Sequence, residues 1–240
     1  MKKIIYLIAF LPLLVFAQAA ETQKLTTTEF TIKNGHADHF KEGVKLWKEC
    51  YMANKGTWKW NLWQRQNGQG TSFVVGSMQK NWAEMDQTDE AGKKCRNISL
   101  EKITPHVEST NKMMSTTMPE VSRESDPATK VIWVGFFKVN NSTEFNEVLK
   151  EVNSMVKTVE GKTRNQWYVV AGGGPDDADY FAVTPYANYA ALDIKRDGVW
   201  KMYEAKHGKE KSDALRARFR ASVDENWAYM YKLNEELSNQ

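Results

Sequence analysis

The sequence predicts an α+β protein built from two tandem ferredoxin-like (βαββαβ) units. Apolar residues recur at helical spacing after a strand-like stretch, a hairpin signal follows, and the whole pattern occurs twice along the chain. Each half therefore reads strand, helix, strand, strand, helix, strand, which is the split βαβ arrangement. We assign residues 26–118 to the first unit, 119–129 to a linker and 130–238 to the second unit. Two unrelated α+β domains are the alternative.

The first strand and helix repeat at a constant offset. Ile32 ends the strand-like segment EFTIK, and its counterpart Phe137 lies 105 positions later in VIWVGFFKV. The apolar stripes of the following helices keep the same offset: Phe40, Val44 and Trp47 in the first half, and Phe145, Leu149 and Val152 in the second. Gly56 and Gly161 also match, and we expect each to end its helix in the left-handed conformation that glycine adopts readily.

The remaining elements follow in the same order. WKWNLWQRQ and TRNQWYVVA are predicted strands, and each runs into a glycine-rich turn, at residues 67–70 and 172–177. The return strands TSFVVGSM and DYFAVTPY align Phe73 with Phe181, an offset of 108. Second helices are predicted to start near NWAEMDQ and ANYAALD, and DALRARFRASV is predicted to form an additional helix. Each half closes with a related segment, HVESTNKMMSTTMPEVS or SVDENWAYMYKLNEELS.

Residues 1–19 are predicted to be a cleaved signal peptide. Lys2 and Lys3 precede an apolar run that ends in the small-x-small site Ala17-Gln18-Ala19. The run is too short for a transmembrane helix, which needs about 20 residues, so we expect no membrane span after cleavage. The predicted location is the bacterial periplasm or the medium. Cleavage reduces the excess of Lys+Arg (33) over Asp+Glu (30) to 31 against 30, which gives no reason to expect nucleic acid as a partner.

Only two cysteines are present, Cys50 and Cys95. In an exported chain the oxidising compartment favours a disulfide between them. Two buried free thiols are the alternative. Two cysteines alone supply too few ligands for a structural metal site.

The first hairpin carries an unusual concentration of tryptophan. Strand alternation places Trp58, Trp60 and Leu62 on one face, which we expect to pack against helices. The other face carries the candidate ligand-binding residues Lys59, Trp63 and Arg65. The equivalent strand of the second half offers Arg164 and Tyr168, and this mixed aromatic and cationic set would suit a planar or anionic small molecule.

The histidines complete the set of candidates. His106, at the start of the last strand of the first unit, is a further candidate ligand-binding residue and could act as an acid or base, although a structural role is the alternative. His36 and His39, with Asp38, could hold a metal ion, but such a pair on an amphipathic helix is more often exposed to solvent, and we expect no metal site. No GxSxG, HExxH or Walker motif occurs, so the sequence identifies no catalytic residues.

The tandem arrangement resembles the dimeric α+β barrel superfamily, which includes antibiotic-biosynthesis monooxygenase-like and NIPSNAP-like domains. The helix stripes, the two glycines and the endings TMPEVS and LNEELS carry the resemblance, which extends over residues 26–238. It implies that the two antiparallel sheets pack into one α+β barrel with helices outside. One chain would supply both units as a monomeric pseudo-dimer, with further association left open.

Members of that superfamily include cofactor-free monooxygenases, haem-degrading enzymes and ligand-binding proteins. No histidine of this chain matches the haem-ligating position, so we expect no cofactor. The leading hypothesis is an exported protein that binds a small hydrophobic or aromatic molecule, with a monooxygenase-like activity on an aromatic compound as its enzymatic version. A non-enzymatic envelope or stress protein acting by protein contact and a haem-binding protein are the alternatives. Whether the protein is an enzyme is left open.

The predicted signal peptide determines where the exported protein should begin. When the full chain is produced in a bacterium with a general secretion pathway, the exported protein should begin at Ala20, because signal peptidase cuts after the small-x-small site. Intact mass and N-terminal sequencing of the periplasmic fraction measure this. Recovery of uncleaved chain only in the cytoplasm would contradict the prediction.

Overall fold

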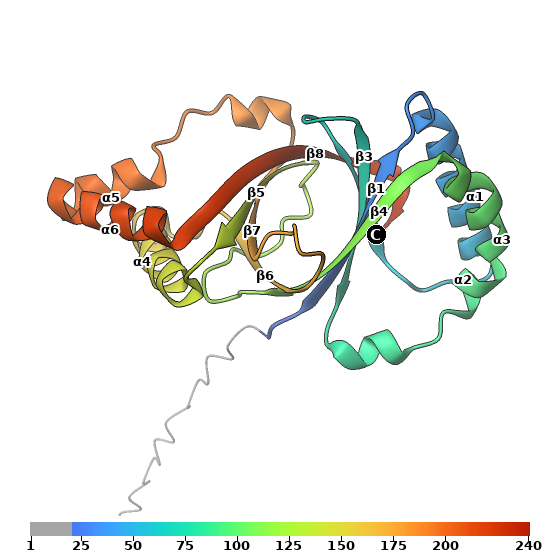
Figure 1. Cartoon of the computed structure of the whole chain (residues 1–240), viewed down its shortest axis with the longest axis horizontal. Coiled ribbons are helices and arrows are strands. Elements are labelled where there is room, and N and C mark those ends of the chain that lie inside the picture. The colour runs from blue at the N-terminus through green and yellow to red at the C-terminus, as the bar shows by residue number, and fades with distance from the viewer. Residues whose placement is uncertain (1–20) are drawn as a thin grey trace, which may run out of the picture.

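The computed structural model describes residues 21–240, so the predicted signal peptide lies outside the described residues. Eight strands form one closed barrel, and helices cover it at both ends of the molecule's long axis (Figure 1). Within residues 21–240 no helix has the length and apolarity needed to cross a membrane.

The elements follow the predicted order in each unit. The first unit contains β1 (Lys24–Ile32), α1 (Ala37–Ala53), β2 (Trp60–Arg65), β3 (Thr71–Gln79), η1 (Trp82–Asp86), α2 (Glu90–Lys94), α3 (Arg96–Ile98), η2 (Ser99–Ile103), η3 (Thr104–His106) and β4 (Val107–Thr117). The second contains β5 (Val131–Val139), α4 (Ser142–Glu160), β6 (Gln166–Gly172), β7 (Tyr180–Tyr186), η4 (Tyr189–Leu192), α5 (Val199–His207), α6 (Lys209–Ser222) and β8 (Val223–Asn239).

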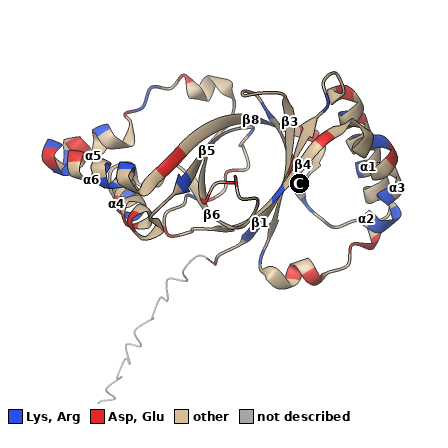
Figure 2. Cartoon of the chain, in the orientation of Figure 1, with Lys and Arg blue, Asp and Glu red and all other residues tan. Residues whose placement is uncertain are grey.

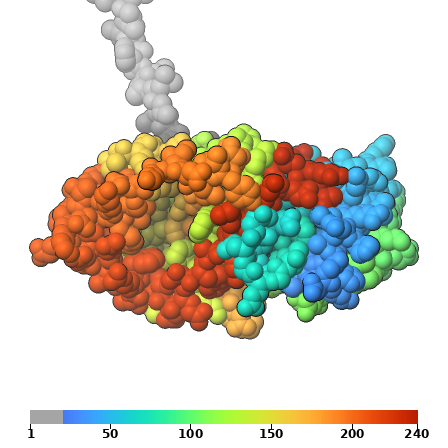
Figure 3. All heavy atoms as spheres, turned by 90° about the horizontal axis from the view of Figure 1, so that it is seen from above, coloured from blue at the N-terminus to red at the C-terminus, as the bar shows by residue number. Residues whose placement is uncertain are grey.

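Strand pairing between the units closes the barrel. The order around it is β1-β3-β2-β8-β5-β7-β6-β4, and all neighbours are antiparallel. The last strand of each unit pairs with its own first strand and with the second strand of the other unit, as β4 does with β6 and β8 with β2. In the space-filling view the red atoms of β8 accordingly reach the blue first unit (Figure 3). The predicted α+β barrel is confirmed.

Two kinds of core result from strand alternation. One lies between each sheet and its helices, where Trp60 and Leu62 pack with Phe40 and Tyr51 in the first unit. The other lies inside the barrel and includes Tyr168. Lys, Arg, Asp and Glu concentrate on the outer helices, while most of the strand surface carries other residue types (Figure 2).

The first hairpin places its tryptophans as alternation predicts. Trp60 is 4% exposed and its indole Nε1 donates to the backbone oxygen of Leu237 at 2.9 Å. Trp58 is 38% exposed but still packs on Trp60, with ring centroids 5.0 Å apart. Trp63 points to the opposite side, into the barrel. Trp60 therefore lies in the helix-facing core as predicted, whereas Trp58, which precedes β2, packs on that core but is exposed.

The helix ends differ from the expectation in one unit. Gly161 follows α4 with φ of 77°, as predicted for a left-handed cap. After α1 the left-handed residue is Lys55, with φ of 59°, so the prediction for Gly56 is wrong. Gly56 is required for space instead, because a Cβ there would lie 2.0 Å from the Tyr51 ring.

The alignment of the return strands is also corrected. Phe73 faces the helices and packs with Phe40, whereas Phe181 faces the barrel interior. The offset of 108 therefore pairs residues from opposite faces. A shift of one residue exchanges the two faces of a strand, and similarity of residue type could not detect it. Phe73 pairs with Phe30 of β1. The counterpart of Phe30 in the second unit is Gly135, 105 positions later, and Gly135 pairs with Ala182. The structural counterpart of Phe73 is therefore Ala182.

The second helices start later than expected. The segments NWAEMDQ and ANYAALD form only the short turns η1 and η4. Asn81 and Asn188 cap them by accepting bonds from the backbone N–H of Glu84 at 3.3 Å and of Ala191 at 3.0 Å. The longer helical segments follow as α2 to η3 and as α5 and α6, and the latter contains the predicted DALRARFRASV helix.

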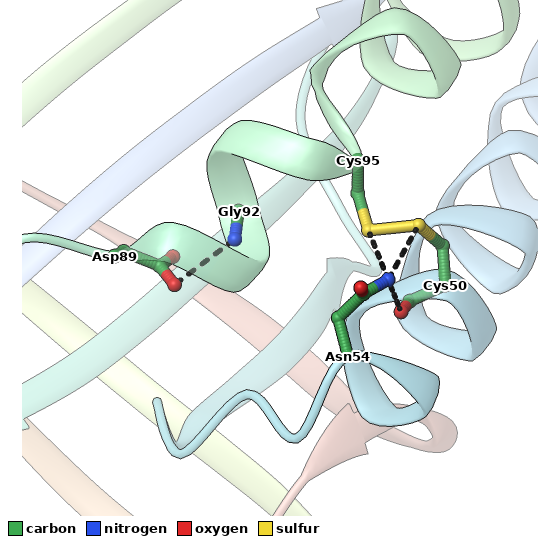
Figure 4. Close-up of a disulfide and its surroundings, with 5 residues drawn as sticks. All are labelled: Cys50, Asn54, Asp89, Gly92 and Cys95. Carbon is green, nitrogen blue, oxygen red and sulfur yellow. Dashed lines mark hydrogen bonds between the residues drawn. A yellow bond between two sulfur atoms is a disulfide. The ribbon is translucent and has the colours of Figure 1, made fainter.

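Cys50 and Cys95 form a disulfide that joins α1 to the end of α2 (Figure 4). Asn54 lies beside it and donates from Nδ2 to the Cys50 backbone oxygen at 2.9 Å. Asp89 caps α2 through the Gly92 N–H at 3.0 Å. The bridge thus holds the short helices of the first unit against its long helix.

Removal of the bridge should destabilise the protein. The cysteines are separated by 45 residues, and loop-closure entropy then predicts a loss of about 4 kcal/mol in the free energy of unfolding. Urea unfolding of the wild type and of the Cys50→Ser/Cys95→Ser double variant measures it. The double variant should not respond to dithiothreitol, and a wild type that is equally insensitive would contradict a stabilising bridge.

Candidate functional site

The barrel interior contains a partly open cavity of about 350 Å³. This lies at the lower end of the range for small-molecule sites, roughly 300–1,000 Å³. Its lining is contributed by the strands, the linker between β4 and β5, and the β6–β7 hairpin: Gln23, Leu25, Thr27, Glu29, Asn61, Trp63, Val74, Gly76, Met78, Asn111, Met113, Ser125, Asp126, Thr129, Ile132, Val134, Phe136, Gln166, Tyr168, Asp177, Ala178, Phe181, Val183, Pro185, Trp227, Tyr229 and Tyr231.

Aromatic side chains dominate this surface. Seven of the lining residues are aromatic: Trp63, Phe136, Tyr168, Phe181, Trp227, Tyr229 and Tyr231. Two stacked pairs form among them, Phe136 on Trp227 with centroids 5.5 Å apart and Tyr168 on Phe181 at 4.7 Å. Each strand delivers its members at alternate positions, as Trp227, Tyr229 and Tyr231 show along β8.

One ion pair lies at the edge of the aromatic surface. The Glu29 Oε1 atom accepts a bond from Arg65 Nη1 at 3.0 Å and another from the hydroxyl of Ser72. The Arg65 side chain is 12% exposed and its guanidinium lies 4.8 Å over the Tyr229 ring, while Glu29 is 31% exposed. Arg65 is fixed further by the backbone oxygen of Gln69. Among the described residues nothing accepts a bond from its Nε.

Two buried phenols face the cavity. Burial alone raises the pKa of Tyr168 to about 12, and burial with the nearby charge of Glu29 raises the pKa of Tyr231. Both hydroxyls therefore stay protonated at neutral pH. In residues 21–240 neither hydroxyl has a hydrogen-bond partner, and buried polar groups of this kind are normally bonded to protein, water or ligand.

Comparison with known proteins gives structural matches only. No protein-family model matches the chain, and no curated protein matches its sequence. An anthrone oxidase-like protein superposes with a TM-score of 0.54 at 13% identity, over 90% of this chain and 93% of that one. A proposed monooxygenase from Lactobacillus acidophilus gives 0.53 at 12%, over 89% and 94%. A mutant chlorite dismutase from Candidatus Nitrospira defluvii gives 0.52 at 9%, over 90% and 92%.

These matches extend over nine-tenths of each chain and share the closed antiparallel barrel. The fold is that of the dimeric α+β barrel. At such identities the similarity concerns the fold and not the activity. In this α+β barrel one chain supplies all eight strands.

The barrel brings together half of the sequence-predicted site residues. Trp63 and Tyr168, which are separated by the repeat offset of 105, both line the cavity. Arg65 contacts the lining residues Glu29 and Tyr229 without lining the cavity itself. Ligand binding by these three residues stays a prediction.

The other three candidates lie elsewhere. Lys59 is exposed just before β2 and donates to the backbone oxygen of Gln240 at 2.7 Å. Arg164 lies before β6, where it pairs with Glu160 and donates to the backbone oxygen of Asp197 at 2.9 Å. His106 lies beside the start of α1. None of the three lines the cavity, so the expected cationic lining does not form.

The lining also contains residues that sequence reasoning missed. Trp227, Tyr229 and Tyr231 occupy alternate positions in a predicted strand, and this period of two was a usable signal for one aromatic face. Glu29 lies in the predicted strand EFTIK, and one acidic residue in a strand does not by itself indicate a ligand-binding site. Ser125, Asp126 and Thr129 belong to the linker, whose path depends on tertiary structure.

A haem group does not fit this lining. Of the four histidines, three gather beside α1 and the fourth, His207, stacks on Tyr203 at 4.4 Å, so none reaches the cavity. The volume suits a molecule of a few rings rather than a tetrapyrrole. Among the described residues no group of three or more His, Cys, Asp and Glu side chains is arranged to hold a metal ion.

His36, His39 and His106 form a separate cluster on the outside of the first unit. The Nδ1 atoms of His36 and His106 are 2.9 Å apart, so one ring donates and the other accepts. The rings of His39 and His106 stack at 5.2 Å. Burial lowers the pKa of His106, and the charges of His36, His39 and Lys33 lower it further.

This lowered pKa predicts a pH-dependent stability. Because the folded state binds a proton at His106 less readily than the unfolded chain does, the free energy of unfolding should fall as the pH drops below about 6.5. His106→Asn should weaken this dependence in urea titrations between pH 7.5 and 5, and His207→Asn serves as the control. An unchanged pH dependence in His106→Asn would contradict this.

Proposed function

We propose that this protein binds a small, largely apolar or aromatic molecule inside its barrel. The observation that carries the proposal is the cavity of about 350 Å³ inside the barrel, with seven aromatic residues in its lining. Such cavities, with a few polar groups among hydrophobic walls, are the usual form of small-molecule sites. We further propose that the protein acts outside the cytoplasm, which the predicted leader supports.

The composition of the lining favours a ligand over a cavity left to water. Most of the lining residues are apolar or aromatic, and apolar surface left in contact with water is unfavourable by roughly 25 cal/mol per Å². Larger side chains at positions such as Gly76 would fill the space, so a binding role accounts for its retention.

The alternatives receive less support. Haem binding lacks a histidine in the lining. Action by protein contact would need an exposed apolar surface rather than an internal cavity, and a cavity is present. Oxygenation of an aromatic compound is the reaction that the names of two structural neighbours suggest, and Glu29 is one of three lining carboxylates, with Asp126 and Asp177, that could accept a proton. The Glu29 carboxylate already pairs with Arg65, so binding is the better supported function.

Two glycines provide a matched test of the cavity. Gly76 lines it, and a Cβ there meets Leu25 at 3.6 Å, while Gly135 faces the helices and its Cβ meets Phe137 at 3.7 Å. Both positions are in strands, where valine is well tolerated. Gly76→Val therefore fills the cavity, and Gly135→Val makes the same change outside it.

The measurement uses the neutral fluorophore N-phenyl-1-naphthylamine. The wild type should enhance the fluorescence of the probe. Gly76→Val should lower the affinity at least about tenfold, because overpacking costs roughly 1–3 kcal/mol. Gly135→Val should change the affinity little. Native mass spectrometry of protein from its own host should also reveal a retained small molecule. Equal affinities of the two variants would place binding elsewhere and contradict the proposal.

A further inference from the structure

The cavity lining is electrostatically one-sided. Among the 27 described residues that line it, three carry carboxylates, Glu29, Asp126 and Asp177, and none is Lys, Arg or His. The three come from separate elements: β1, the linker, and the β6–β7 hairpin. The lining residues themselves therefore carry acidic groups and no basic ones, although Arg65 pairs with Glu29 and Arg123 pairs with Asp126 from outside the lining.

Part of this negative charge is available to a ligand. At Glu29 both protein bonds go to Oε1, and within the described chain no hydrogen bond reaches Oε2. Asp177 accepts from Asn111 Nδ2 at 2.7 Å and from the Gly174 N–H at 2.5 Å, which are uncharged donors. The nearby Lys138 pairs with Asp176 instead. Glu29 and Asp126 each pair with a guanidinium, that of Arg65 at 3.0 Å and that of Arg123 at 3.4 Å, so among the described residues Asp177 is the lining carboxylate without one.

The aromatic walls have the same electrostatic preference. The face of an aromatic ring is the negative end of its quadrupole, so it attracts a cation and repels an anion. Arg65 already makes this contact from outside, 4.8 Å over the Tyr229 ring. The strongest cation–π partner is tryptophan, and Trp63 and Trp227 both line the cavity.

A second observation indicates that a ligand belongs here. Tyr168 is 7% exposed, lines the cavity, and has no hydrogen-bond partner for its hydroxyl among residues 21–240. Its hydroxyl oxygen opens onto the cavity, where a bound molecule or water can bond to it. A molecule in the cavity would supply the missing partner.

We propose that the ligand is a compact organic cation, a protonated or quaternary amine joined to an apolar or aromatic body. This rests on the proposed binding function and specifies the charge of its ligand. The ammonium group lies against Glu29 Oε2 and the ring faces, and the apolar body occupies the rest of the cavity. Anionic molecules of the same size are excluded, which reverses the preference expected from Lys59, Arg65 and Arg164.

Three probes of similar size and different charge test this: benzyltrimethylammonium, neutral N,N-dimethylbenzamide and anionic phenylmethanesulfonate. Each is titrated against bound N-phenyl-1-naphthylamine in the full-length mature protein. We expect the cation to compete at a concentration at least about tenfold lower than the amide, in line with cation–π energies near 2 kcal/mol in desolvated sites, and the anion to be the weakest.

Two variants locate the effect. Glu29→Gln should remove most of the preference for the cation and leave the affinity for the amide within about twofold. The control Glu108→Gln, on the exposed surface of β4, should change neither the preference nor the affinity for the amide. Asp177→Asn keeps the size of the side chain but can accept only one of its two hydrogen bonds, and it should reduce the preference in the same direction, which provides a second test if Glu29→Gln folds poorly.

The outcomes separate the two proposals. If the amide or the sulfonate competes as well as the cation, or if both charge-removing variants keep the full preference, the inference of a cationic ligand is wrong and small-molecule binding stands. If the fluorophore and all three probes fail to bind, the proposed binding function itself is contradicted.

Discussion

The exchange of strand partners between the two units determines the rest of the structure. Each four-stranded sheet would end in unpaired edges, and the pairing of β4 with β6 and of β8 with β2 removes them. Closure is the arrangement that leaves a sheet without exposed edges. It also gives every strand an inner and an outer face, so the helices must pack outside and the alternate residues of all eight strands must share one interior.

That alternation explains what the sequence could predict. The offset of 105 identified the strands and helices, and the period of two separated Trp60 from Trp63 correctly. The same reasoning failed between Phe73 and Phe181, because an insertion in the hairpin changes which face a residue occupies without changing its type. Residue patterns therefore located the elements, while the face of each return strand depended on pairing with distant strands.

The cationic residues that were predicted to bind the ligand do not line the cavity, for a related reason. Lys59 and Arg164 each precede the first residue of their strands, β2 and β6, so the alternation of the sheet does not hold them to the inner face. Lys59 reaches the backbone of Gln240, and Arg164 reaches Glu160 four residues earlier on α4. Arg65 lies within β2, but its guanidinium stays outside the cavity lining, over the Tyr229 ring and paired with Glu29. The position of each residue relative to the ends of its strand therefore decides where its side chain lies, and strand ends are predicted poorly from sequence.

The Glu29–Arg65 pair also makes the two halves of the cavity unequal. At the repeat offset of 105, Val134 is the counterpart of Glu29 and Val170 is the counterpart of Arg65. Both valines belong to the interior apolar cluster. Trp63 and Tyr168, by contrast, are similar in size and both aromatic. A symmetric barrel would present two equivalent half-sites to a small molecule. Here the strands of the first unit hold the Glu29–Arg65 pair and those of the second hold valines at the matching positions, while the second unit's carboxylate, Asp177, lies in the β6–β7 hairpin, so the two halves present different polar groups to a bound molecule.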